Sequence, residues 1–512
     1  MKSLDQLRRD AKTLRKAHQA GDIHARQRIA NHPPRSEDTT LKHADYLHVI
    51  ARENSFVSWP TLKAAVEVDG LDLAARRQRL RIAVFNGQAH VAARILAQDP
   101  DPAAGDLALE IALYRKDAVF RALDADPEAA ARVFNGRAPI CHLAFSKAIH
   151  MTASSEDDML AIADRLVALG ADVNASIPVA PDNDHPLSAL YGAIGHANNM
   201  PLAKWLLEQG ANPNDGESLY HATELGHPEA LKMLLEHGAD PKGTNALLRA
   251  MDFNDHKAVE MLVAAGARAD DFDGTHVGGE APWVVPALHQ AARRMSDARM
   301  IDILLDAGAD PTRVFEGNTA YGYARVFGNT TLAEAIEARG HAPDLTDAER
   351  LLARAADGED TGDAQVDPEV LPKAYRTIIR TILHLPGKLD HIRRLVALGV
   401  EFDVPDTEGL TPVQVAGWEG LPDVMAYLLS LGPDLMHQNG YGGSLLSTIL
   451  HGSENAPGAE TRDHAGCLLL ALEAGVPVPR RAPDLAGVPE LAEILADWCE
   501  AHPEQVVEGG AI

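Results

Sequence analysis

The chain has 512 residues, with 47 Lys and Arg against 74 Asp and Glu, which gives a formal net charge of −27. A surface this acidic repels phosphate groups, so the composition disfavours nucleic acids and anionic membranes as partners and favours neutral or basic proteins. Hydrophobic residues make up 46% of the chain but aromatic residues only 5%, so small aliphatic side chains must supply the packing of several domains or of one elongated array.

The cysteine spacing and the N-terminal stretch indicate in which cellular compartment the protein is expected. Cys141, Cys467 and Cys499 are far apart and form no paired motif, which suits a reducing environment. The first residues, MKSLDQLRRDAKTLRK, lack the apolar core of a signal peptide, and no apolar run reaches the roughly 20 residues that a membrane-spanning helix needs. The sequence therefore predicts a cytoplasmic protein.

Residues 1–69 have the spacing of amphipathic helices and contain no internal repeat. Ser58 is predicted to begin a helix near the end of this segment, with Phe56 and Trp59 packing against the first repeat. An array of repeats must cover the apolar side of its terminal unit, so we expect residues 1–69 to be an N-terminal helical capping region.

Between residues 70 and 345 one short pattern recurs, in degenerate form up to residue 145 and regularly after it. In the copy LLEHGADP (234–241), an apolar helical stripe ends, Gly238 is predicted to take a left-handed conformation, and Asp240-Pro241 prevents the helix from resuming. The pattern therefore describes a helix end and a turn, and it carries no chemistry. The clearest other copies are LVALGADVN (166–174), LLEQGANPN (206–214), LVAAGARAD (262–270) and LLDAGADPT (304–312).

The spacing of these copies suggests a family. Gly210, Gly238 and Gly266 follow one another at 28 residues, and later copies lie 32 or 33 residues apart. Segments such as SLYHATELGH (218–227) and LTPVQVAGWEG (410–420) precede the copies and weakly follow a T-P-L-H-x-A pattern, which together with a period of about 33 residues is typical of ankyrin repeats. The chain thus resembles the ankyrin-repeat family, and its two ends are similar to those of uncharacterised bacterial members.

The resemblance implies an all-α solenoid of stacked helix-turn-helix units that binds other proteins, and it brings no established activity. It also implies that His221, His227 and His289 make hydrogen bonds between neighbouring turns. Two insertions depart from the family period, SIPVAPDNDHP (176–186) and DFDGTHVGGEAPW (271–283). We expect both at the edge formed by the loops between repeats, which would give an irregular rim.

Three segments follow the regular repeats. Residues 346–369 are predicted to form a helix that begins with the capping box Thr346-x-x-Glu349 and then an acidic, flexible loop. Residues 370–502 are predicted to contain further repeats and a terminal cap helix, and residues 503–512 a disordered tail. A locally basic zone near residues 371–395 is either a solvated helix face or a site for an acidic ligand; it contains Arg376, Arg380, Lys388, Arg393 and Arg394.

Motifs for catalysis are missing from the sequence. It contains no GxxxxGK[ST], HExxH, GxGxxG or GxSxG, and its histidines lack metal-ligand spacing, so we predict no catalytic residue, no metal and no cofactor. The stretch HQNGYGGSLLSTILHGSEN (437–455) is nevertheless unusually polar, and stacking would bring it beside the equivalent part of the preceding repeat. Candidate binding residues are Trp418, Glu419, Tyr441, His451, Ser453 and Glu454, with Trp283 as a weaker candidate.

A plainer interpretation of this stretch is that its glycines form turns and that Ser453 or Asn455 caps the next helix. For the chain as a whole we favour a non-enzymatic scaffold that presents a concave groove and an irregular rim to a neutral or basic protein. One alternative is an enzyme of the hydrolase or transferase type, acting on a small molecule in a pocket around Trp418 and His451. The other is an acidic inhibitor that masks a basic protein.

Overall fold

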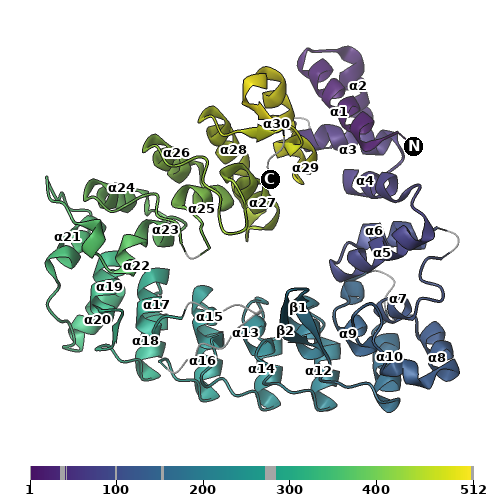
Figure 1. The fold of residues 1–512 in the computed structure, drawn as a ribbon, viewed down its shortest axis with the longest axis horizontal. Helices are drawn as coiled ribbons and strands as arrows, with labels where there is room; N and C mark the ends of the chain where they lie inside the picture. The colour runs from purple at the N-terminus through teal and green to yellow at the C-terminus, as the bar shows by residue number, and fades with distance from the viewer. Residues whose placement is uncertain are drawn as a thin grey trace. The chain divides into compact units, whose positions relative to one another are not determined.

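The computed structural model describes residues 2–34, 41, 43–98, 101–151, 155–270, 284–406 and 408–508. Its contacts divide the chain into two compact units. The first contains Met1–Leu7 and Ala51–Asp310, and the second contains Arg8–Ile50 and Pro311–Ile512. In each unit, pairs of short helices stand one after another in rows, as the labelled ribbon in Figure 1 shows.

The first unit is built from helices and one longer hairpin. Helices α1 (Leu4–Gln19) and α3 (His43–Glu53) each have residues in both units. Its other helices are α4 (Trp59–Val68), α5 (Leu73–Phe85), α6 (Ala89–Leu96), α7 (Leu107–Ala112), α8 (Lys116–Ala125), α9 (Pro139–Ala144), α10 (Glu156–Ala168), α11 (Ala189–Tyr191), α12 (Met200–Glu208), α13 (Ser218–Ala222), α14 (Glu229–Glu236), α15 (Ala246–Asp252), α16 (His256–Ala264), α17 (Ala287–Arg294) and α18 (Ala298–Asp306).

Equivalent glycine corners end the second helix of successive repeats. The backbone angle φ is +89° at both Gly210 and Gly238, +104° at Gly266 and +86° at Gly308. Each of these glycines donates its N–H to the carbonyl three residues earlier, and the following alanine donates to the carbonyl five residues earlier; for Gly238 and Ala239 these bonds are 3.1 and 3.0 Å long. A residue without Cβ takes this left-handed conformation at little cost, so the predicted helix stop is confirmed.

Stacking buries the apolar stripes that single repeats cannot cover. Helices α13, α15 and α17 pack in one row, and α10, α12 and α14 pack in a second. In α14, Leu234 and Ala230 are completely buried, and Leu231 is only 1% exposed. The all-α repeat architecture predicted from the sequence is therefore confirmed.

The insertion at residues 176–186 forms strands that the sequence analysis did not predict. Strands β1 (Ser176–Ala180) and β2 (Asn183–Ser188) pair as an antiparallel hairpin, with Ile177 opposite Leu187. Both of these side chains are buried, and they alternate with more exposed neighbours at the period of two that a half-buried strand requires. The second insertion, which includes Trp283, lies outside the described residues.

The second unit continues the same kind of packing. Two short strand pairs join its helices: antiparallel β3 (Val314–Phe315) with β4 (Asn318–Thr319), and parallel β5 (Val478–Pro479) with β6 (Val506–Val507). Its helices are α2 (Ile23–Asn31), α19 (Ala320–Phe327), α20 (Thr330–Ala338), α21 (Asp347–Ala356), α22 (Lys373–Arg376), α23 (Ile378–Ile382), α24 (Leu389–Ala397), α25 (Pro412–Trp418), α26 (Pro422–Ser430), α27 (Leu445–Asn455), α28 (His464–Glu473), α29 (Ala482–Leu485) and α30 (Pro489–Ala501).

Residues 346–369 lie within one continuous stack of the second unit. The capping box is present, because Thr346 and Glu349 each accept the backbone N–H of the other. Helix α21 packs against both α19 and α24. The loop for which the sequence predicts flexibility is attached to the end of α24 at two points: Val366 N donates to Leu398 O at 2.8 Å, and Gln365 Nε2 donates to Ala397 O at 2.8 Å.

The terminal segments of the second unit contact each other. Helix α1 is joined to α30 by ion pairs of Lys12 with Asp497 and of Arg15 with Glu493. Where the sequence predicts a disordered tail, β6 pairs with β5, because the apolar Val506 and Val507 find a strand edge to cover. In the described part of the chain, no helix has the length and apolarity needed to cross a membrane.

Candidate functional site

A cavity of about 910 Å³ lies over helices α25 and α27 of the second unit. Side chains of α23, α25, α27 and α29 line it, together with the turns that precede α25 and α27. Of the six predicted binding residues that the structure describes, five line this cavity: Trp418, Glu419, Tyr441, His451 and Glu454. Ser453 does not. We call this cavity with its lining residues the α25–α27 groove.

Two glycines allow α25 and α27 to approach closely. A Cβ added to Gly452 of α27 would lie 2.7 Å from the Cα of Trp418, and one added to Gly417 of α25 would lie 2.7 Å from Cγ1 of Ile449. The resulting contact holds the rings of Trp418 and His451 with centroids 5.1 Å apart and planes tilted by 51°. The lining of the groove thus includes a tilted aromatic pair, a favourable arrangement for two π-systems.

The turn that carries Tyr441 is fixed although its ring is 72% exposed. The side-chain oxygen of Asn439 accepts the N–H groups of Tyr441 and Gly443, at 3.0 and 2.9 Å. The N–H of Gly440 donates to the carbonyl of Glu408 in the preceding turn, at 2.7 Å. An ordered backbone therefore presents a large exposed aromatic side chain at the edge of the groove.

The carboxylates of the groove have partners within the fold. Glu419 lies 3.4 Å from the guanidinium of Arg462, and Glu454 accepts the N–H of Gly487 at 2.7 Å. Arg380 forms an ion pair with Asp406. These contacts hold the charged groups in defined positions around Trp418.

Two further basic side chains of the locally basic zone at residues 371–395 also have partners within the fold. Arg376 forms ion pairs with Glu401 at 2.6 Å and with Glu369 at 3.1 Å. Lys388 donates to the carbonyl of Phe327 at 2.8 Å, and burial lowers the pKa of this amine. These contacts disfavour a site for an acidic ligand, and the burial of Lys388 shows that this residue is not part of a solvated helix face either.

The plainer interpretation of this stretch expected Ser453 or Asn455 to cap the following helix, and neither residue does so. The hydroxyl of Ser453 donates to the carbonyl of Leu450 at 2.6 Å. The amide of Asn455 donates to the carbonyl of His451 at 2.9 Å, and its nitrogen lies 3.0 Å from Nδ1 of the same residue. Asp463 caps α28 instead, accepting the N–H of Gly466 at 2.7 Å.

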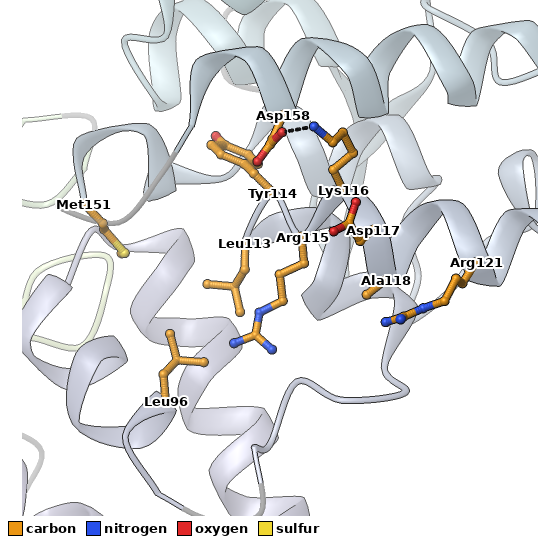
Figure 2. Close-up of a pocket in the computed structure, with 10 residues that line it drawn as sticks. All are labelled: Leu96, Leu113, Tyr114, Arg115, Lys116, Asp117, Ala118, Arg121, Met151 and Asp158. Carbon is orange, nitrogen blue, oxygen red and sulfur yellow. Dashed lines mark hydrogen bonds and ion pairs between the residues drawn. The ribbon is translucent and has the colours of Figure 1, made fainter.

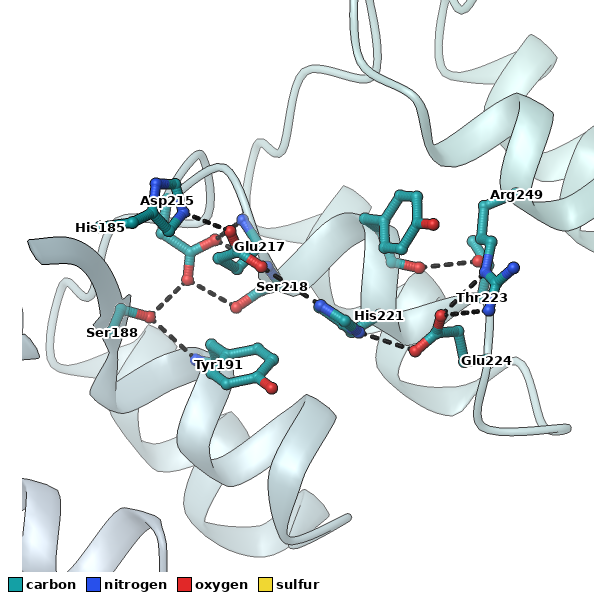
Figure 3. Close-up of polar contacts among 11 residues, drawn as sticks. His185, Ser188, Tyr191, Asp215, Glu217, Ser218, His221, Thr223, Glu224 and Arg249 are labelled. Atoms are coloured by element: carbon teal, nitrogen blue, oxygen red, sulfur yellow. Dashed lines mark hydrogen bonds and ion pairs between the residues drawn. The ribbon is translucent and has the colours of Figure 1, made fainter. Parts of the chain in front are cut away.

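A polar network in the first unit was missed by the sequence analysis (Figure 3). Glu217, which is completely buried, lies 2.5 Å from His185 and 3.2 Å from His221. His221 also contacts Glu224 at 2.7 Å, and Glu224 accepts from Arg249 at 2.8 Å. Burial opposes the positive charge of His221, but hydrogen bonds to both carboxylates outweigh it and raise the pKa of His221 to about 9.

These contacts bear on the hydrogen bonds expected for histidines. His227 lies 3.0 Å from Oδ1 of Asn198 in the preceding repeat, so the expected bond between neighbouring turns is confirmed for this residue. The ring nitrogens of His221 bond to Glu217 and Glu224 of its own repeat, which corrects the expectation there. The sequence did contain a sign of these contacts, because Glu217 and Glu224 lie four and three residues from His221, a spacing at which helical side chains meet.

A further cavity of about 510 Å³ lies beside α8 in the first unit (Figure 2). Lys116 on its wall pairs with Asp158, as the dashed line in Figure 2 shows. Arg115 pairs with Asp101. Two of the basic side chains of this cavity, Arg115 and Lys116, are thus neutralised by partners within the fold.

Comparisons with known proteins address the family. A model described as ankyrin repeats (3 copies) matches residues 190–273. Among solved structures, the ankyrin repeat domain of Bcl-3, titled a unique member of the IkappaB protein family, is 20% identical over 45% of this chain and 97% of its own, with a TM-score of 0.34. The human ASB11 ankyrin repeat domain is 19% identical over 49% of this chain and 96% of its own, with a TM-score of 0.21.

A search of curated proteins found no match. At such low TM-scores the two solved structures carry no argument about this chain. The matched family model covers the repeats whose glycine corners are equivalent in the structure, from α12 to α16. Residues 190–273 are therefore similar to ankyrin repeats, and the structure shows the stacked helix pairs of such repeats there.

Proposed function

We propose that this protein is a non-enzymatic scaffold that binds a segment of another protein in the α25–α27 groove. Ankyrin repeats generally act as protein-interaction scaffolds. The observation that carries the proposal is that one cavity combines the exposed ring of Tyr441 with the tilted pair of Trp418 and His451. Tyr and Trp contribute disproportionately to binding energy at protein interfaces, because they bury a large area at a small cost in conformational entropy.

The charges around the groove favour a basic partner. Three carboxylates line it, those of Glu408, Glu419 and Glu454, and Glu419 lies 3.4 Å from Arg462; the arginine that lines it, Arg380, is paired with Asp406. A lysine or arginine of the partner would meet these carboxylates, and an apolar side chain would pack beside Trp418. The net charge of −27 would also attract a basic partner from a distance at low salt.

The contacts of Ser453, Glu454 and His451 do not favour a catalytic role for the groove. The hydroxyl of Ser453 is bonded to its own helix and does not line the cavity, and Glu454 is bonded to the backbone of Gly487. An activated nucleophile needs a base within hydrogen-bond reach and a group that orients this base. The contacts described for His451 are with Asn455 and Trp418, and they do not supply such a set.

Peptide selection against the intact chain tests the proposal. Peptides enriched from a random display library are measured for affinity to the wild type and to Trp418→Ala, Tyr441→Ala and Phe253→Ala variants. Phe253 is the matched control, because it is 52% exposed but belongs to α15's C-terminal end in the first unit. We expect each groove variant to lose at least about tenfold in affinity, as hot-spot residues do, and the control to bind as the wild type does.

Tyr441→Ala is the safer of the two groove variants, because an exposed ring on an ordered turn contributes little to folding. Enriched peptides should be rich in lysine or arginine, and their affinity should fall moderately as salt increases. Unchanged affinity in both groove variants would exclude these residues from the site. Binding that disappears with salt but ignores both aromatic substitutions would favour the acidic-inhibitor alternative.

A further inference from the structure

Arg137 of the first unit is held by a tight hairpin turn. Phe134 and Arg137 exchange both backbone hydrogen bonds, at 2.9 and 3.0 Å. The two residues between them, Asn135 and Gly136, have φ angles of +50° and +76°, the Asn-Gly combination of a type I′ turn. The carbonyl of Phe134 also lies 2.9 Å from Nε2 of His142 in α9, which ties the turn to the helix.

The guanidinium of Arg137 lies over aromatic rings and lacks an acidic partner. Its central carbon is 4.7 Å from the ring centroid of Phe85 and 5.8 Å from that of Phe145. Among the residues that the structure describes, no carboxylate forms an ion pair with it and no acceptor takes its N–H groups. Burial lowers the pKa of this side chain, which is the expected cost of removing an unpaired cation from water.

Arg137 faces a cavity of about 390 Å³ that is separate from the α25–α27 groove. Its walls come from α5, α7 and α9, and about half of its lining residues are apolar, with Ile82, Leu109 and Phe145 among them. Of its other charged or titratable groups, Arg81 is paired with Asp106 at 2.5 Å. Burial lowers the pKa of His142, which favours the neutral form of this ring.

The cavity therefore combines apolar lining residues, two of them stacked phenylalanines, with one unneutralised cation. The chain as a whole has a net charge of −27. The Phe85 and Phe145 rings are nearly parallel, with an interplanar angle of 4°. A guanidinium presents its N–H groups as a planar fork that matches both oxygens of a carboxylate. Ligand cavities of roughly this size are usually apolar, with a few polar groups that fix orientation.

We propose that this cavity binds a small organic carboxylate, with the acid group on Arg137 and the apolar body against Phe85 and Phe145. The site lies in the first unit and does not depend on the protein-binding role proposed for the second. An amide of the same shape lacks the negative charge and should bind far more weakly. Inorganic phosphate offers charge without an apolar body, so it separates recognition of a carboxylic acid from capture of any anion.

The full-length protein with ¹⁵N-labelled arginine provides a direct test. Benzoate and hexanoate serve as aromatic and aliphatic probes, benzamide as the neutral isostere of benzoate, and inorganic phosphate as the simple anion. We expect at least one of the two carboxylates to shift the Nε–H resonance of Arg137 with saturation. Benzamide and phosphate should leave that resonance in place at the same concentrations.

Two variants complete the test. Arg137→Gln should lose saturable carboxylate binding by at least tenfold while retaining its unfolding temperature, because it removes an unpaired charge. Arg132→Gln is the control, since Arg132 is exposed and paired with Asp126 at 2.8 Å, and it should bind as the wild type does. The proposal is overturned if neither carboxylate moves the Arg137 resonance, if benzamide or phosphate binds as tightly, or if Arg137→Gln retains full affinity.

Discussion

Glu217 illustrates the demands that a single buried charge makes on its surroundings. Its side chain is completely buried, and a carboxylate in that position is stable only with close, well-oriented partners. His185 approaches it from the β1–β2 hairpin and His221 from its own helix, α13. His221 also contacts Glu224, and Glu224 accepts a hydrogen bond from Arg249 of the next repeat. Charged side chains of consecutive repeats are therefore linked through the imidazolium of His221.

The protonation of His221 should make stability depend on pH. Its pKa in the folded protein is about 9, above the ordinary value of 6.5, so its stabilising contribution is complete below about pH 6.5 and is lost as the pH rises through 9. We expect His221→Gln to lower the unfolding temperature most at pH 6 and much less at pH 9.5, as measured by thermal denaturation. Thr223→Val, which removes a neutral hydrogen bond to Tyr220, is the control and should have a constant effect. A constant effect of His221→Gln would mean that the imidazole is not charged in the folded protein.

Helices in this protein depend on glycine in two physically different ways. Gly238 ends α14 in a left-handed conformation, and a Cβ there would meet no atom within 4 Å. Gly452 lies within α27, and a Cβ there would overlap the carbonyl of Trp418. The first glycine is needed for its backbone angle, and the second for the distance between two helices.

Substitution by Ala and Asn should distinguish the two roles. At Gly238, Ala should cost about 1–2 kcal/mol of unfolding free energy, and Asn should cost less because it tolerates the left-handed region. At Gly452 the order should reverse, with about 1–3 kcal/mol for Ala from overpacking and more for the larger Asn. Urea unfolding gives these energies, and Trp418 fluorescence should change only for the Gly452 variants. The same order of Ala and Asn at both positions would refute the distinction.

At the scale of the whole molecule, the charge of −27 acts against the stacking that holds the repeats together. Many ion pairs link neighbouring elements, such as Arg165 with Asp124 and Arg299 with Glu260, but pairs at exposed positions contribute little each. Repulsion among the excess carboxylates acts over longer distances and is the part that salt screens most.

Salt should therefore stabilise this protein. Between about 0.01 and 0.1 M NaCl the Debye length falls from roughly 30 to 10 Å, and the unfolding temperature should rise over that range. Thermal denaturation by circular dichroism at constant pH provides the measurement. A fall in unfolding temperature would show that the ion pairs between elements outweigh the repulsion of the net charge.

The sequence by itself determined the features that depend on neighbouring residues. Gly238, Gly266 and Gly308 marked the helix ends because the left-handed corner is a local property, and Thr346 with Glu349 marked a helix start for the same reason. Repetition extended this local information, because equivalent positions of adjacent repeats lie side by side once the repeats stack. That is why Trp418 and His451 could be expected near one cavity.

Only the tertiary structure decided the rest, because those features join residues that are distant along the chain. The approach of Gly452 to Trp418, the partners of Glu217 and the position of Arg137 over Phe85 each depend on how separate elements pack. The hairpin of residues 176–188 is an intermediate case, since its strands become stable only where Ile177 and Leu187 find a surface to cover. Local patterns carry no information about such long-range contacts, which arise from the packing of whole elements.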